Sequence, residues 1–221
     1  MGTCSLLKAA VPTGKMKNTK MPLKKSGLSS SLQITPPVFA QTPCPANDFL
    51  SENMRILVLT EGTVIIHKCA AGHSREEIER QVGREQESVH DYASYVPVGD
   101  AVKKLVNWRK DGAEILYLTS RRKPEEIGHI KNVLSKYGFP EGQLLFRREN
   151  EEYKDVAERV VPDVLVEDDC ESIGGISEMT ITHVEPEIKK RIKSIPVKEF
   201  GGIDHLPDET SALLKYQPGL A

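Results

Sequence analysis

The sequence has few cysteines, no long apolar run and no overall surplus of positive charge. Its four cysteines are scattered without a C-x-x-C spacing, which favours free thiols over a disulfide framework. No apolar stretch approaches the roughly 20 residues that a membrane span needs. Residues 54–221 hold 24 basic and 30 acidic residues, a net charge of −6. Because binding to nucleic acid needs a basic face, we do not expect nucleic acid as the main partner.

The first 53 residues differ from the rest of the chain. They lack hydrophobic periodicity and are rich in Ser, Thr, Pro and Lys, which predicts a disordered segment. Six lysines and two acids give this segment a net charge of +4. It has neither the apolar core of about 7–15 residues found in signal peptides nor the arginines of transit peptides. We therefore expect a cytoplasmic protein, and favour a native start at Met54, with residues 1–53 as an overcalled start or a dispensable extension.

From Met54 onward, short apolar runs alternate with amphipathic segments. This alternation predicts an α/β fold of three layers, with a doubly wound and mostly parallel sheet. The chain after Ile195 is expected to be an irregular wrap, punctuated by Gly and Pro. Strands are predicted over residues 56–59, 114–121, 143–146, 163–169 and 179–183.

The helices of residues 54–221 have recognisable start and stop residues. Asp100 is placed to cap one helix and Pro124 to begin another. Gly112 and Gly138 follow these two helices, where glycine supplies the left-handed conformation that ends a helix. Further helices are predicted over residues 152–161 and from Pro186 onward.

The segment over residues 64–97 is predicted to be a small cap or flap. Its first residues, 64–67, are apolar enough for a short flap hairpin. Ser74 and Glu77 have the spacing of a capping box, which predicts the start of a helix. The surface of that helix is strongly charged, so we expect it to lie outside the core.

Polar side chains follow three of the predicted strands at the points where the strands end. Because the carboxyl ends of parallel strands meet at one edge of a sheet, these groups are expected in one crevice. Carboxylates bind Mg²⁺, hydroxyl and ammonium groups bind phosphoryl oxygens, and a positioned acid transfers a proton to a leaving group. The residues concerned are Glu61 and Thr63, then Thr119 and Ser120, then Glu167, Asp168 and Asp169, with Lys154 on the preceding helix.

The order of these groups resembles the haloacid dehalogenase (HAD) superfamily of phosphohydrolases. The first motif of that family is an apolar strand followed by Asp-x-Asp-Gly-Thr, and the same places here read Leu59-Thr60-Glu61-Gly62-Thr63. The resemblance covers residues 54 to about 175 and implies a phosphorylated small molecule as ligand and Mg²⁺ as cofactor. It implies phosphate binding by Thr119, Ser120 and Lys154, and metal binding by Asp168, Asp169 and Glu61.

The chain departs from the family pattern at the nucleophile, which is Leu59 here. Two functions are therefore open. One is a divergent Mg²⁺-dependent phosphohydrolase that uses Glu61 or a metal-bound water in place of the missing aspartate. The alternative is a catalytically inactive relative that binds a phosphorylated ligand or a protein partner. Each predicted site residue also has a plainer interpretation as a turn, cap or solvated surface residue.

Overall fold

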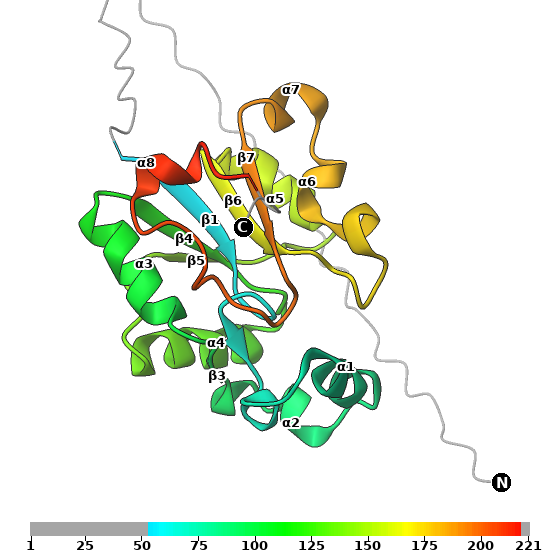
Figure 1. The fold of residues 1–221 in the computed structure, drawn as a ribbon. Coiled ribbons are helices and arrows are strands. Elements are labelled where there is room, and N and C mark those ends of the chain that lie inside the picture. Colours follow the sequence, from blue (N-terminus) through cyan, green and yellow to red (C-terminus); the bar gives the residue numbers. More distant parts are fainter. Residues whose placement is uncertain (1–52, 218–221) are drawn as a thin grey trace, which may run out of the picture. The chain divides into compact units, whose positions relative to one another are not determined.

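The computed structural model describes residues 53–217, and its centre is a parallel sheet of five strands (Figure 1). The strands lie in the order β5-β4-β1-β6-β7. Counted along the chain, this order is 3-2-1-4-5, which is that of a doubly wound fold. The predicted α/β class is therefore confirmed. The strands are β1 (Arg55–Leu59), β4 (Glu114–Leu118), β5 (Gln143–Leu145), β6 (Val164–Asp168) and β7 (Lys193–Val197).

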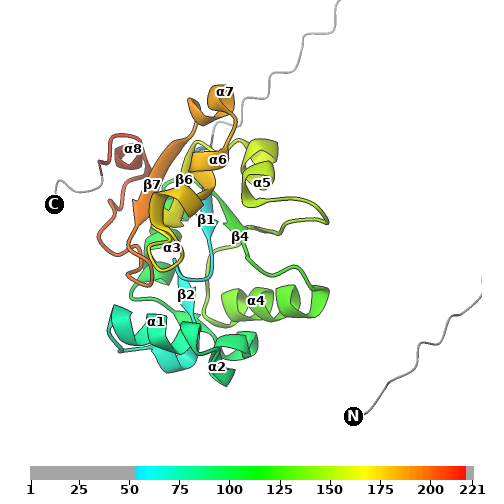
Figure 2. The ribbon, with the colours of Figure 1, turned by 90° about the vertical axis from the view of Figure 1, so that its right-hand side faces the viewer.

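Helices cover both faces of this sheet (Figures 1 and 2). Along β1, the side chains of Ile56 and Val58 pack on one face and that of Leu57 packs on the other. Trp108 is fully buried on the first face. Because both faces are covered, the central strands are apolar throughout. The first face is covered by α3 (Ala101–Lys110), α4 (Pro124–Lys136) and α8 (Thr210–Leu213), and the second by α5 (Tyr153–Val160), α6 (Thr180–His183) and α7 (Pro186–Lys189).

The predicted helix boundaries agree with the structure at most positions. Pro124 is the first residue of α4, and Gly138 follows that helix at a φ of +75°. Gly112 follows α3 at a φ of +95°. Asp100 precedes α3, but its side chain makes no capping hydrogen bond. Its backbone N–H instead donates to the carboxylate of Asp204, which ties the start of α3 to the segment after β7.

A small insertion separates β1 from α3, and its helices lie at the lower right of Figure 1. The two ends of the insertion pair as short antiparallel strands. The residues predicted to form a local hairpin therefore pair with a strand at the far end of the insertion instead. Ser74 Oγ accepts a hydrogen bond from Glu77 N at 3.4 Å, as the predicted cap requires. The elements are β2 (Ile65–Ile66), η1 (Lys68–Ala70), α1 (Arg75–Gly83), α2 (Glu87–His90), η2 (Tyr92–Ser94) and β3 (Val96–Pro97).

Two predictions for the last third of the chain are wrong. Residues 179–183, predicted as a strand, contain the short helix α6, which follows the 3₁₀ turn η3 (Gly175–Glu178). The irregular wrap predicted to begin after Ile195 begins later, because Ile195 lies in a strand that was not predicted, β7, which pairs in parallel with β6. β7 is an edge strand, so Pro196 can occupy it without removing a hydrogen bond from the centre of the sheet.

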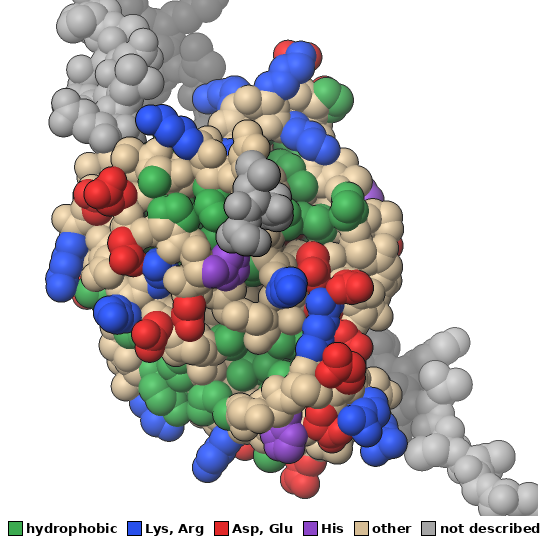
Figure 3. Space-filling view, viewed as in Figure 1, with side chains coloured by type: hydrophobic (Ala, Val, Ile, Leu, Met, Phe, Trp, Pro, Cys, Tyr) green, Lys and Arg blue, Asp and Glu red, His purple; other side chains and the backbone are tan. Residues whose placement is uncertain are grey.

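Residues 1–52 and 218–221 lie outside the described part, and with them nearly all of the predicted disordered extension of residues 1–53. Within residues 53–217, every helix is too short or too polar to cross a membrane. On the face drawn in Figure 3, acidic and basic side chains lie interspersed.

Candidate functional site

A pocket of about 310 Å³ lies at the carboxyl ends of β1, β4 and β6. The sheet order reverses between β1 and β6, and ligands of doubly wound sheets bind at such a reversal. Larger hollows occur elsewhere on the described surface, but they lie away from these strand ends. The pocket lining brings together groups from all three strand ends and from α5. It includes Leu59, Glu61, Ser120, Arg121, Tyr153 and Asp168.

The carboxylate of Glu61 lies among hydrogen-bond donors at the end of β4. Thr119 Oγ1 donates to Glu61 Oε1 at 2.6 Å, and Ser120 N donates to Glu61 Oε2 at 3.1 Å. Arg121 Nε lies 3.6 Å from Glu61 Oε1. Thr60 Oγ1 donates a further hydrogen bond to Glu61 Oε2 at 2.5 Å. We call the Thr119 hydroxyl, the Ser120 N–H and the Arg121 guanidinium the anion cradle, and its occupant is a carboxylate of the same chain.

Arg121 supplies the positive charge of the anion cradle, and the sequence prediction missed it. Its Nη2 donates to Ser120 Oγ at 2.6 Å, and its Nη1 donates to Tyr92 Oη. The guanidinium also lies 4.5 Å from the centroid of the Tyr92 ring, within the range of a cation–π contact. Tyr92 belongs to the insertion, which therefore helps to hold this arginine. The sequence offered one signal for Arg121, which is its position directly after the Thr119-Ser120 pair.

A second arginine, Arg147, lies beside the anion cradle. Its Nη2 donates to the carbonyl of Ser120 at 3.2 Å, and its guanidinium lies 3.9 Å from the centroid of the Tyr153 ring. Lys154, predicted to bind phosphate, pairs with Asp155 at 2.9 Å and has a 38% exposed side chain. Its neighbour Tyr153 lines the pocket in its place. A phosphate contact by Lys154 stays a prediction, while Arg121 is the cation that lines the pocket.

Asp168 is the last residue of β6 and lines the pocket. It is 8% exposed, and its two oxygens accept hydrogen bonds from Thr63 Oγ1 at 3.2 Å and from Cys170 N at 3.1 Å. Burial raises the pKa of Asp168 above its usual value, and these hydrogen bonds oppose the rise. A Cβ atom at Gly62 would lie 3.2 Å from Asp168 Oδ2, and Gly62 has a φ of +83°, so this turn requires glycine.

The two neighbours of Asp168 point to other parts of the molecule. Glu167 is fully buried, and its carboxylate accepts hydrogen bonds from the backbone N–H groups of α6. Burial raises the pKa of Glu167, and these hydrogen bonds oppose that shift. Asp169 Oδ1 accepts hydrogen bonds from Glu199 N at 3.1 Å and from Arg75 Nη2 at 3.3 Å. The three consecutive acids therefore accept hydrogen bonds in three different parts of the molecule.

The acids predicted to bind magnesium are hydrogen-bonded to protein donors in this arrangement. Mg²⁺ requires near-octahedral oxygen ligands, but Glu61, Asp168 and Asp169 each accept hydrogen bonds from protein donors. Leu59 offers no ligand atom. Over residues 53–217, no three Asp, Glu, His or Cys side chains are placed to hold a metal ion. The magnesium site stays a prediction from the sequence, which these contacts do not favour.

Comparison with known proteins adds little to this geometry. No protein family and no curated protein matches the chain. Two solved structures of a class C acid phosphatase from Bacillus anthracis are similar to it, each with a TM-score of 0.43. The structure with tungstate bound is 14% identical and matches 77% of this chain and 75% of its own; the other is 13% identical and matches 74% and 78%. A likeness this weak carries no functional argument, so the site must be interpreted from its own residues.

Proposed function

We propose that this chain is a HAD-like protein that binds the phosphate group of a phosphorylated small molecule in the anion cradle and does not form a phosphoenzyme. The observation that carries the proposal is the position of the Glu61 carboxylate, held by Thr119 Oγ1, Ser120 N and Arg121. A hydroxyl, a backbone N–H and a guanidinium are the donors that bind phosphoryl oxygens in other proteins. In this proposal, Glu61 occupies the cradle when no ligand is bound and leaves it when phosphate enters.

Charge favours this exchange. A phosphate monoester is close to a dianion at neutral pH, whereas Glu61 contributes one negative charge to the cradle. Arg121 lines the pocket and Arg147 lies beside it, and both guanidinium groups attract the dianion more strongly than a single carboxylate. The rings of Tyr92 and Tyr153 keep the two guanidinium groups in place during the exchange.

The apolar side of the pocket argues for binding without a covalent step. Leu59 stands where an attacking carboxylate would be needed, and it packs with the second apolar cluster. Cys170 also lines the pocket, but burial raises the pKa of its thiol to about 12. Because the thiolate is the nucleophilic form, this cysteine is unreactive at neutral pH. Neither residue supplies a nucleophile, so a phosphohydrolase, one of the two functions left open by the sequence, would have to use Glu61 or a metal-bound water.

The test is calorimetric titration of the full chain with inorganic phosphate and with a panel of phosphorylated metabolites. Thr119→Ala should weaken binding about 5–10-fold, because one hydrogen bond contributes about 1 kcal/mol. Glu61→Gln should strengthen it, since the uncharged amide no longer competes for Arg121. The controls are Thr182→Ala, whose hydroxyl bonds to Ile176 on the surface, and Glu114→Gln, at the opposite end of β4.

Turnover of the same compounds is measured in parallel, in EDTA and in MgCl₂. We expect none in either buffer. Hydrolysis that requires Mg²⁺ and disappears in Glu61→Gln would replace this proposal with the phosphohydrolase. Equal phosphate affinity in Thr119→Ala and Thr182→Ala would show that the anion cradle is not the binding site.

A further inference from the structure

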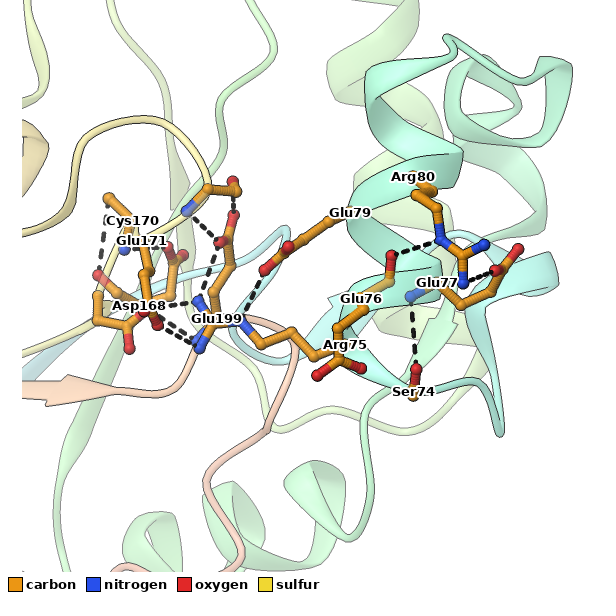
Figure 4. Close-up of polar contacts among 12 residues, drawn as sticks. Ser74, Arg75, Glu76, Glu77, Glu79, Arg80, Asp168, Cys170, Glu171 and Glu199 are labelled. Atoms are coloured by element: carbon orange, nitrogen blue, oxygen red, sulfur yellow. Dashed lines mark hydrogen bonds and ion pairs between the residues drawn. The ribbon is translucent and has the colours of Figure 1, made fainter.

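Four carboxylates lie within ion-pair distance of the guanidinium of Arg75, the first residue of α1. Figure 4 shows Arg75 with three of these acids, Glu79, Glu171 and Glu199. Arg75 Nε lies 2.9 Å from Glu79, and Nη1 lies 2.7 Å from Glu171. Nη2 lies 3.3 Å from Asp169 and 3.5 Å from Glu199. We call these five residues the Arg75 cluster. It lies next to the pocket, whose lining includes Glu199.

The acids of the Arg75 cluster come from separate parts of the chain. Asp169 and Glu171 follow β6, Glu199 follows β7, and Glu79 belongs to α1 itself. Glu199 is further fixed by Ser172, which donates to it through both its backbone N–H and its hydroxyl. The side chain of Arg75 is 24% exposed and that of Glu199 is 11% exposed. Partial burial makes these ion pairs stronger than pairs in open water.

Acids gathered after β6 and β7 repel one another unless a cation lies between them. A divalent metal ion and a guanidinium are two solutions to this repulsion, and both compete for the same oxygen lone pairs. Arginine suits several partners at once because its planar group carries five N–H donors. Arg75 is also part of the chain, so its local concentration is high, whereas Mg²⁺ loses hydration water reluctantly.

We propose that Arg75 is the permanent counter-ion of the four acids in the Arg75 cluster and that the protein binds no divalent metal ion there. The inference rests on the contacts of Arg75 and not on the proposed phosphate binding. It accounts for the contact between Asp169 and the first residue of α1. It also gives α1 a polar anchor to the sheet, in addition to the small apolar cluster that contains Ile78 and Ile66.

The test is thermal unfolding of the full chain in EDTA, in millimolar MgCl₂, and in NaCl of the same ionic strength. The wild-type melting temperature should be equal in MgCl₂ and in the matched NaCl buffer. Arg75→Ala should melt at least about 2–4 °C lower in EDTA, the shift that 1 kcal/mol causes in a domain of this size. MgCl₂ should then restore part of the loss, because the exposed carboxylates become free to bind it.

Arg80→Ala is the matched control. It lies on the same helix with a 60% exposed side chain and pairs only with Glu77 among the acids of the described chain. Its melting temperature should be close to that of the wild type and should not change with MgCl₂. Arg75→Lys should melt between the wild type and Arg75→Ala, because an ammonium keeps the charge but lacks the planar fork.

Two results would overturn the inference. One is a wild-type melting temperature that rises in MgCl₂ above the NaCl control, with a saturable heat of Mg²⁺ binding that Asp169→Asn abolishes. The other is an Arg75→Ala protein that melts like Arg80→Ala and does not respond to MgCl₂. If Arg75→Ala does not fold, the wild type in the three buffers and Arg75→Lys decide the question.

Discussion

At the scale of single residues, Leu59 is the position that most limits the chemistry of the pocket. It lies at the end of β1 and shares the pocket lining with Glu61 and Asp168. A carboxylate at this position would add an oxygen ligand beside Asp168 and create a site with excess negative charge. The apolar side chain instead keeps the pocket free of that charge, which fits an arrangement balanced by arginines.

The corresponding prediction concerns Leu59→Asp, with Leu59→Asn as a polar control of the same size. In EDTA, Leu59→Asp should melt about 2–4 °C below the control, because both variants lose the apolar contacts of Leu59 but only the new carboxylate repels Asp168. MgCl₂ should raise its melting temperature more than that of Leu59→Asn. Thermal unfolding in matched ionic strength measures both effects. Equal responses of the two variants to MgCl₂ would show that this pocket cannot accept a metal even with the added ligand.

The sequence indicated which residues would meet at the pocket better than it indicated what they would bond to. Glu61, Thr119 and Ser120 come together because strand ends of a parallel sheet converge, which the alternation of elements predicts. The resemblance implied a metal contact for Glu61, which stays a prediction, and the structure shows its carboxylate hydrogen-bonded to Thr119 and Ser120. The geometry of the turn that carries a carboxylate determines which donors the carboxylate can reach. The order of residues in the sequence does not specify that geometry.

At the scale of elements, α6 shows how tertiary contacts override local propensity. Residues 179–183 include Thr, Ile and Thr, which favour a strand on local grounds. The buried carboxylate of Glu167 accepts hydrogen bonds from Thr180 N at 2.7 Å and Ile181 N at 3.1 Å. It thereby satisfies backbone donors that a helix leaves unpaired at its start. This contact spans two elements, so the local pattern could not predict it.

Glu167→Gln tests this contact. A glutamine has one oxygen acceptor, so at least one of the two buried N–H groups faces an amide NH₂ and loses its partner. The free energy of unfolding should fall by about 1–3 kcal/mol, the penalty for an unsatisfied buried donor. Urea denaturation measures it, with Glu178→Gln on the exposed neighbouring turn as the control. An unfolding free energy equal to that of the control would mean that α6 forms without its carboxylate partner.

At the scale of the whole molecule, the segment after β7 completes the fold. Ile203, Leu206 and Leu213 are buried in the same apolar cluster as Trp108. Two side chains of α3 bind the backbone of this segment: Lys104 Nζ donates to Leu206 O at 2.6 Å, and Trp108 Nε1 donates to Pro207 O at 2.9 Å. The sequence predicted an irregular wrap after Ile195, which holds only for the chain between the end of β7 and the start of α8. Where the wrap attaches depends on α3, about 100 residues earlier in the chain.

Trp108→Phe separates the polar attachment of this segment from its apolar packing. Phenylalanine keeps an aromatic ring in the core but removes the donor to Pro207 O, so the free energy of unfolding should fall by about 1–3 kcal/mol. Lys103→Ala, on the exposed side of the same helix, should change it little. Far-UV circular dichroism should record one transition for both variants, because the segment belongs to the same core as β1 and α3. A second, earlier transition in Trp108→Phe would mean that the segment detaches before the sheet unfolds, and that the core of β1 and α3 is stable without it.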